Sequence, residues 1–87
     1  MKHPRLKPDT VLRQEEDGAF LFDPISDALV CVNETGREIV RGLDEGKSVD
    51  EIITKLNVLY PDIEPKTLQE DVLSFVERLV ERGFIES

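Results

Sequence analysis

The spacing of apolar residues changes once along this 87-residue chain, and the change comes at Asn33. Before Asn33 the chain consists of short apolar segments separated by turn residues, which is typical of β-strands. After Asn33 apolar residues recur every three or four positions, which is the spacing of one face of an α-helix. A chain of this length forms one small domain. The sequence therefore predicts an α+β domain in which the sheet comes first and the helices follow.

Three strands are expected, over residues 11–14, 19–22 and 28–32. Asp17 and Gly18 separate the first two strands and indicate a hairpin, because both residue types tolerate positive φ. Asp23 and Pro24 begin a second group of turn residues before the third strand. Short links of this kind predict an antiparallel meander, with the third strand at one edge of the sheet.

Three helices are expected after the sheet. Asn33 is a good N-cap for the first helix. Ser48 and Glu51 form a capping box for the second, in which each side chain accepts a hydrogen bond from the other residue's backbone amide. Pro65 suits the first position of the third helix, and Gly83 is a suitable residue to follow its end. A three-stranded antiparallel sheet followed by three helices is a winged-helix-like arrangement.

The net charge of the chain is −8, and it is unevenly distributed. Residues 1–9 contain two prolines and three basic residues and are expected to form a flexible lead-in to a single domain over residues 10–87. Because the first eight residues carry a charge of +3, the remainder carries −11. Proteins bind nucleic acids largely by neutralising phosphates, so a body with this charge is not expected to bind DNA or RNA.

Several classes of site lack the residues that they need. No apolar run approaches the about 18–20 residues that cross a bilayer, and no signal peptide is evident, so no membrane partner is expected. Cys31 is the only cysteine, which excludes an internal disulfide and favours the cytoplasm. It is interpreted as a small buried hydrophobe. His3 is the only histidine, so no metal site, cofactor or catalytic centre is predicted.

The third strand carries no charged residue or proline to protect its edge. Proteins usually protect such an edge, because its free N–H and C=O groups recruit other strands. The edge could be covered by this chain, by a second copy or by an extended peptide. The apolar stripe of the third helix is wide, so one of its flanks could line a cleft beside this strand, or the width could simply serve the core.

The order of these features resembles the PqqD family, whose members are small peptide chaperones also called RiPP recognition elements. The resemblance covers about residues 4–85 and has no catalytic signature. Its segments are Pro4-Arg5-Leu6 with Pro8, Asp23-Pro24, residues 29–40, residues 44–52, Asp71-Val72 with Phe75 and Leu79, and Gly83-Phe84-Ile85.

The resemblance implies a non-catalytic module that binds the leader of a ribosomally made precursor peptide as an added strand. It further implies a radical SAM modifying enzyme as a partner, in the synthesis of pyrroloquinoline quinone or a related peptide-derived product. Asp71 could pair with a basic leader residue or only stabilise the start of its helix. Carried over by position, the peptide-binding residues are Ala28, Leu29, Val30, Cys31 and Val32 in the strand, and Leu68, Asp71, Val72 and Phe75 in the helix.

Two other functions remain open from the sequence. A winged-helix DNA-binding regulator would share the helix count, although it conflicts with the negative charge of the body. A structural subunit could instead form a homodimer by pairing the edge strand with its own copy. An enzyme is the least favoured class, because no reactive group of residues is present.

Overall fold

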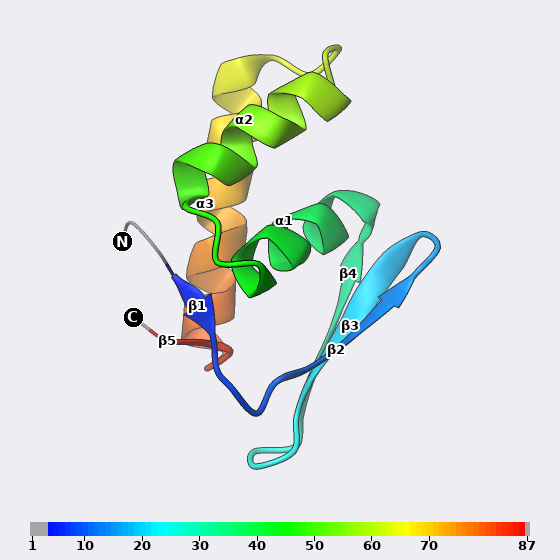
Figure 1. Ribbon diagram of the computed structural model, residues 1–87, viewed down its shortest axis with the longest axis vertical. Helices are drawn as coiled ribbons and strands as arrows, with labels where there is room; N and C mark the ends of the chain where they lie inside the picture. The colour runs from blue at the N-terminus through cyan, green and yellow to red at the C-terminus, as the bar shows by residue number, and fades with distance from the viewer. Residues whose placement is uncertain (1–3, 87) are drawn as a thin grey trace.

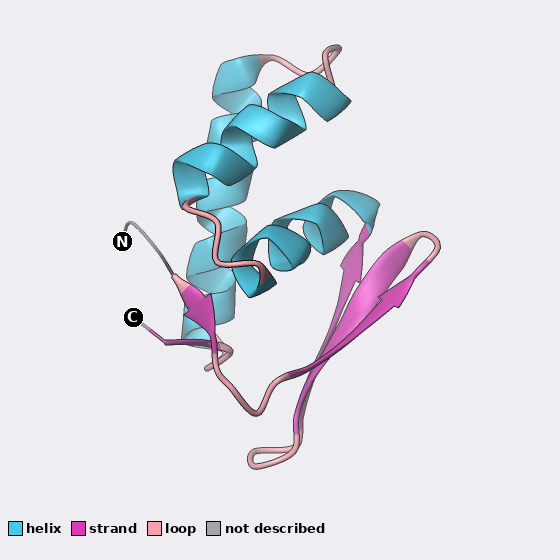
Figure 2. Ribbon diagram, viewed as in Figure 1, coloured by secondary structure: helices cyan, strands magenta, loops and turns pink. Residues whose placement is uncertain are grey.

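The computed structural model describes residues 4–86, in which a three-stranded antiparallel sheet is followed by three helices (Figures 1 and 2). The sheet order is β2-β3-β4, with β2 at Val11–Glu15, β3 at Gly18–Asp23 and β4 at Ala28–Asn33. The predicted meander and the α+β, winged-helix-like architecture are therefore confirmed. β4 lies at an edge of the sheet, as expected.

The two faces of the sheet differ in their surroundings. Leu12, Leu21 and Val30 are cross-strand neighbours on the face that packs against the helices. Most side chains on the opposite face are exposed, including Phe20 of β3 and Leu29 of β4. Cys31 alternates with Val30 and is also exposed, so its interpretation as a buried hydrophobe is wrong. Successive side chains of a strand point to opposite faces of the sheet. A strand at the surface of a small domain therefore buries the side chains on one face only, even when all of them are apolar.

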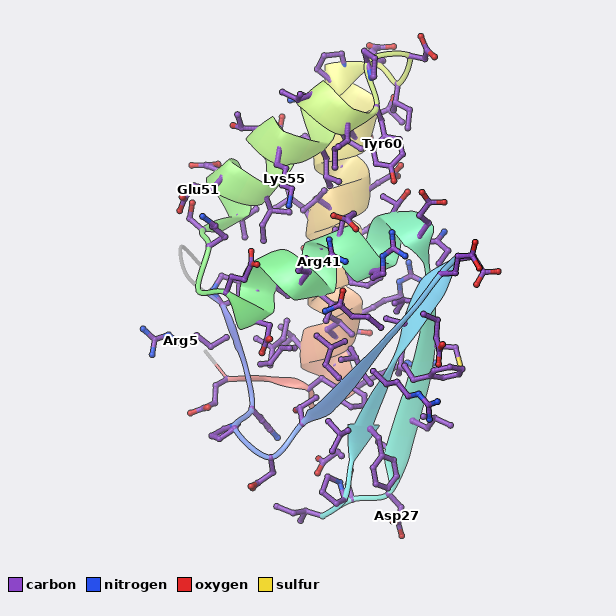
Figure 3. The ribbon with its side chains drawn as sticks, turned by 45° about the vertical axis from the view of Figure 1, so that its right-hand side comes forward. Arg5, Asp27, Arg41, Glu51, Lys55 and Tyr60 are labelled. Atoms are coloured by element: carbon purple, nitrogen blue, oxygen red, sulfur yellow. The ribbon has the colours of Figure 1, made fainter. Side chains whose placement is uncertain are left out.

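The turn between β3 and β4 is fixed by Asp23. The Ile25 amide donates to Oδ1 of Asp23 over 2.9 Å, and the Ser26 hydroxyl donates to Oδ2 over 3.1 Å. The Ile25 and Ser26 donors hold the pKa of the Asp23 carboxyl below its ordinary value, because they favour the ionised form. Asp27, at the tip of this turn in Figure 3, adopts a positive φ of 63°. The turn therefore determines where β4 begins.

The helices begin where the capping residues predict. Helix α1 spans Glu34–Asp44, and the Asn33 side chain accepts a hydrogen bond from the Gly36 amide. Helix α2 spans Val49–Leu59 with the expected capping box at its start. Helix α3 spans Pro65–Glu81, and Gly83 follows with a φ of 81°.

The lead-in is more ordered than its composition suggests. Within it, strand β1 at Arg5–Leu6 pairs with strand β5 at Ile85–Glu86. Pro4 is buried, and the Lys7 amide donates to the carbonyl of Phe84 over 3.0 Å. The prediction of a flexible lead-in over residues 1–9 is thus wrong for the part that the structure describes, because the buried C-terminal tail offers it a partner strand. His3 lies outside the described residues.

An ion cluster joins α1 to the hairpin and to α2. Glu38 is 8% exposed and pairs with Arg37, Arg41 and Lys55 at 3.2, 3.3 and 3.8 Å. Arg37 also donates to the carbonyl of Glu15 over 2.7 Å, at the end of β2. In Figure 3, Lys55 of α2 points toward α1, which carries Arg41. The cluster therefore fixes α1 between α2 and the sheet.

Candidate peptide-binding cleft

The backbone of β4 has hydrogen-bonding groups that face away from the sheet. Glu15 and Gly18 face each other across a two-residue turn, and such a pair exchanges both of its backbone hydrogen bonds. Backbone groups alternate in direction along a strand, so Ala19 of β3 bonds to Val32 of β4. A Cβ built on Gly18 would lie 2.2 Å from the Val32 carbonyl oxygen, as expected if that carbonyl faces β3.

The same alternation gives the direction of the backbone amides and carbonyls along the rest of β4. Val30 and Val32 direct their amides and carbonyls toward β3, whereas Leu29 and Cys31 direct theirs outward. In the described part of the chain, no strand pairs with that outer edge. β4 can therefore accept one further strand through Leu29 and Cys31.

A cleft of about 380 Å³ lies beside this edge, between β4 and the C-terminal half of α3. Phe75 is half-buried in its wall, and Leu79 is 2% exposed. Arg78 and Arg82 are exposed beside them. The full lining is Leu29, Val30, Cys31, Val32, Asn33, Phe75, Arg78, Leu79 and Arg82.

The cleft includes some of the residues implied by the family resemblance and leaves out others. Phe75 and four of the five strand residues line it, whereas Ala28 does not. Leu68 and Val72 are 1% and 0% exposed, belong to the core and are not among the residues that line the cleft. Asp71 is exposed but does not line the cleft.

Sequence reasoning missed the two arginines of the wall. Phe75, Arg78, Leu79 and Arg82 follow the i, i+3, i+4, i+7 spacing of a single helix face, which was a usable signal. Positive charges near the end of a helix also favour its dipole, so the two arginines alone do not indicate a binding site. The helix thus reaches the cleft with its last two turns.

A second hollow, of about 430 Å³, lies between α1 and α2 and includes Gly42 and Leu56. The backbone groups inside a helix are bonded within that helix, so this hollow offers no free strand edge. In the described residues, no cluster of three or more His, Cys, Asp or Glu is placed to hold a metal ion. Nor does that part of the chain contain a helix long and apolar enough to span a membrane.

A family model described as coenzyme PQQ synthesis protein D (PqqD) matches residues 18–85, which include the whole cleft. The chain belongs to the PqqD family. A search of the curated proteins returned no match.

Two solved structures share the fold of this PqqD-family chain. TbiB1 in complex with the TbiA(beta) leader peptide has a TM-score of 0.88 at 20% identity, over 95% of both chains. Lasso peptide synthetase B1 complexed with the leader peptide has a TM-score of 0.85 at 27% identity, over 98% of this chain and 99% of that chain. Both similarities extend over almost the entire domain.

Proposed function

We propose that this chain binds the leader of a ribosomally made precursor peptide as an extra strand on β4. The observation that carries the proposal is the unpaired outer edge of Leu29 and Cys31 beside an open cleft. A strand added there would bond its backbone to the edge and place alternate side chains against Phe75 and Leu79 of α3. Membership of the PqqD family and the leader-peptide complexes of the two structural neighbours support this assignment.

The proposal extends to the next step in the pathway. The bound precursor is presented to a radical SAM modifying enzyme, in the synthesis of pyrroloquinoline quinone or a related peptide-derived product. The chain itself acts without a cofactor and without catalysing a reaction, in the cytoplasm. Co-purification tests this partner wherever a radical SAM enzyme is encoded beside this chain's gene, and the absence of a complex in the presence of the precursor would refute it.

Hydrogen exchange followed by NMR tests strand addition directly. The probe is a synthetic leader peptide from a candidate precursor, chosen among short reading frames beside this chain's gene. Its binding should slow exchange at the Leu29 and Cys31 amides, because they gain acceptors. The amides of Val30 and Val32 already face β3 and should change little. Equal exchange at Leu29 and Cys31 with and without saturating peptide would contradict the proposal.

A proline substitution tests whether peptide affinity depends on the outer edge of β4, and a second proline controls for a general effect on the sheet. Cys31→Pro removes an outward-facing donor from β4, where proline is tolerated because that N–H makes no bond within the sheet. We expect peptide affinity to fall by about tenfold, near the upper end for one lost backbone hydrogen bond. The control is Gln14→Pro, which removes an outward-facing donor from the opposite edge strand, β2. Equal affinity of the folded Cys31→Pro variant would argue against strand addition.

A second copy of the chain is the other candidate for this edge. Light scattering at two protein concentrations, with and without the precursor, distinguishes the two occupants. A monomer that binds one peptide agrees with the proposal. A stable dimer that excludes the peptide would replace it with the structural-subunit function.

A further inference from the structure

The wall of the cleft carries two positive charges, those of Arg78 and Arg82. Arg78 lies in the last turn of α3, Arg82 is the C-cap residue of that helix, and both line the cleft. No ion pair or side-chain hydrogen bond within residues 4–86 involves either guanidinium. Like charges four residues apart on a helix repel each other. In a chain with 19 acidic and 11 basic residues, two neighbouring arginines that form no ion pair within residues 4–86 favour an anionic ligand.

The charge is confined to one end of the cleft. α3 runs in the opposite direction to β4 (Figure 1), so the start of the cleft wall lies near the end of the strand. A Cβ built on Gly36 would lie 2.8 Å from Cβ of Val32 and 2.9 Å from Cε2 of Phe75, which places the Phe75 ring beside Val32. Arg82 follows Phe75 by about 10 Å along the helix axis, toward the Leu29 end.

The other end of the cleft, away from the two arginines, has apolar side chains, and an acidic side chain lies beyond them on α3. Phe75 and Val32 form the apolar end of the cleft, and Asp71 is exposed one turn earlier on the same side of α3. An acidic side chain of a bound peptide is therefore favoured near Arg78 and Arg82 and disfavoured near Asp71. The cleft thus distinguishes the two ends of a strand by charge.

We propose that the cleft selects an acidic leader segment, with an apolar side chain at Phe75 and Asp or Glu near Arg78 and Arg82. Alternate residues of a strand share one face and are about 6.6 Å apart. Because Arg78 and Arg82 lie about 4.5 and 10.5 Å beyond Phe75, the acids belong two and four residues from the apolar anchor. This inference rests on the proposed strand addition and names the chemistry of the peptide.

Selection from a displayed peptide library tests the charge preference without knowledge of the natural precursor. The probe is an mRNA-displayed library of random dodecapeptides, panned against the complete chain. Bound sequences should be enriched in Asp and Glu two and four residues from an apolar residue. The Arg78→Gln/Arg82→Gln double variant should lose this enrichment. Lys66→Gln, at an exposed position on the first turn of α3, should retain it.

A binding measurement then quantifies the effect. One selected peptide and its Glu→Gln analogue are titrated by fluorescence anisotropy at low ionic strength. Each removed charge should raise Kd by about two- to fivefold, the range for exposed ion pairs, and added salt should reduce the difference. In the double variant the Glu→Gln change should have no further effect, because the partners are gone. Circular dichroism verifies that the variants are folded.

The outcomes separate this inference from the proposed function. Selected peptides that protect the Leu29 and Cys31 amides but show no acidic enrichment would overturn the charge preference alone. An equal Glu→Gln effect in wild type and double variant would also overturn it. A library that yields no peptide at the β4 edge would overturn the proposed strand addition, and the charge preference with it.

Discussion

Gly36 connects the stability of this fold to the shape of the cleft between β4 and α3. It is buried in α1, at the point where this helix approaches both β4 and α3. A Cβ at this position would lie 2.8 Å from Cβ of Val32 and 2.9 Å from Cε2 of Phe75. Carbon atoms in contact are most stable at about 3.5–4.0 Å, so the Gly36→Ala variant must open these contacts by about 1 Å.

The two neighbours differ in how they can respond. The Phe75 ring can turn, and the side on which it has space is the cleft. Cβ of Val32 is attached directly to the backbone, so relief there requires β4 to shift relative to α1. The substitution therefore disturbs both walls of the cleft together.

The expected loss of stability is the difference of two terms. Overpacking a close contact typically costs about 1–3 kcal/mol. Because two contacts would lie below 3.0 Å, we expect a cost of about 3 kcal/mol, at the upper end of this range. Alanine gains about 1 kcal/mol over glycine inside a helix. The free energy of unfolding should thus fall by about 2 kcal/mol, which for a domain of this size lowers Tm by about 8–16 °C.

Gly42→Ala is the matched comparison, because Gly42 is also buried in α1. Its added Cβ would lie 2.6 Å from Cγ1 of Ile52 in α2, away from the cleft. Thermal unfolding followed by circular dichroism should show both variants destabilised. Fluorescence anisotropy with the labelled precursor, below both Tm values, should show at least threefold weaker binding for Gly36→Ala only. A Gly36→Ala variant as stable as wild type, or equal binding losses in both variants, would refute the reasoning.

Two further substitutions test the ion cluster at Glu38 and the turn at Asp23. Glu38→Gln should lower the free energy of unfolding by about 1–3 kcal/mol in a urea titration, because three cationic side chains lose the negative charge of their shared buried carboxylate. Glu77→Gln, at an exposed position of α3, should change it by less than about 0.5 kcal/mol, and equal effects would contradict the role of the cluster. Asp23→Asn should lower stability at neutral pH, because the Ile25 and Ser26 donors depress the pKa of Asp23 and so favour folding wherever the carboxyl is ionised. This contribution is complete above the unfolded-state pKa of about 3.9 and is lost as pH falls through the lower folded-state value, so the two proteins should converge in acid and a constant difference would refute it.

The sequence by itself determined the three strands of the main sheet, the three helices and their order. The cap at Asn33, the capping box at Ser48 and the proline at position 65 act on backbone groups within about one helical turn, and all three appear in the structure as predicted. The edge position of β4 also followed from local rules, because short turns between consecutive strands leave the last strand with one neighbour.

Only the tertiary structure decided which groups form the cleft. Helical periodicity relates Phe75 to Arg78 and Arg82, but it does not set the rotation of α3 against the sheet, which depends on how the whole core packs. That packing buries Leu68 and brings the last two turns of the helix to β4. The pairing of β1 with β5 likewise joins residues from opposite ends of the chain, and no local signal encodes it. Interactions between residues close in sequence therefore specify the helices and the strands of the main sheet. The cleft between β4 and α3 depends instead on contacts among residues that are distant in sequence.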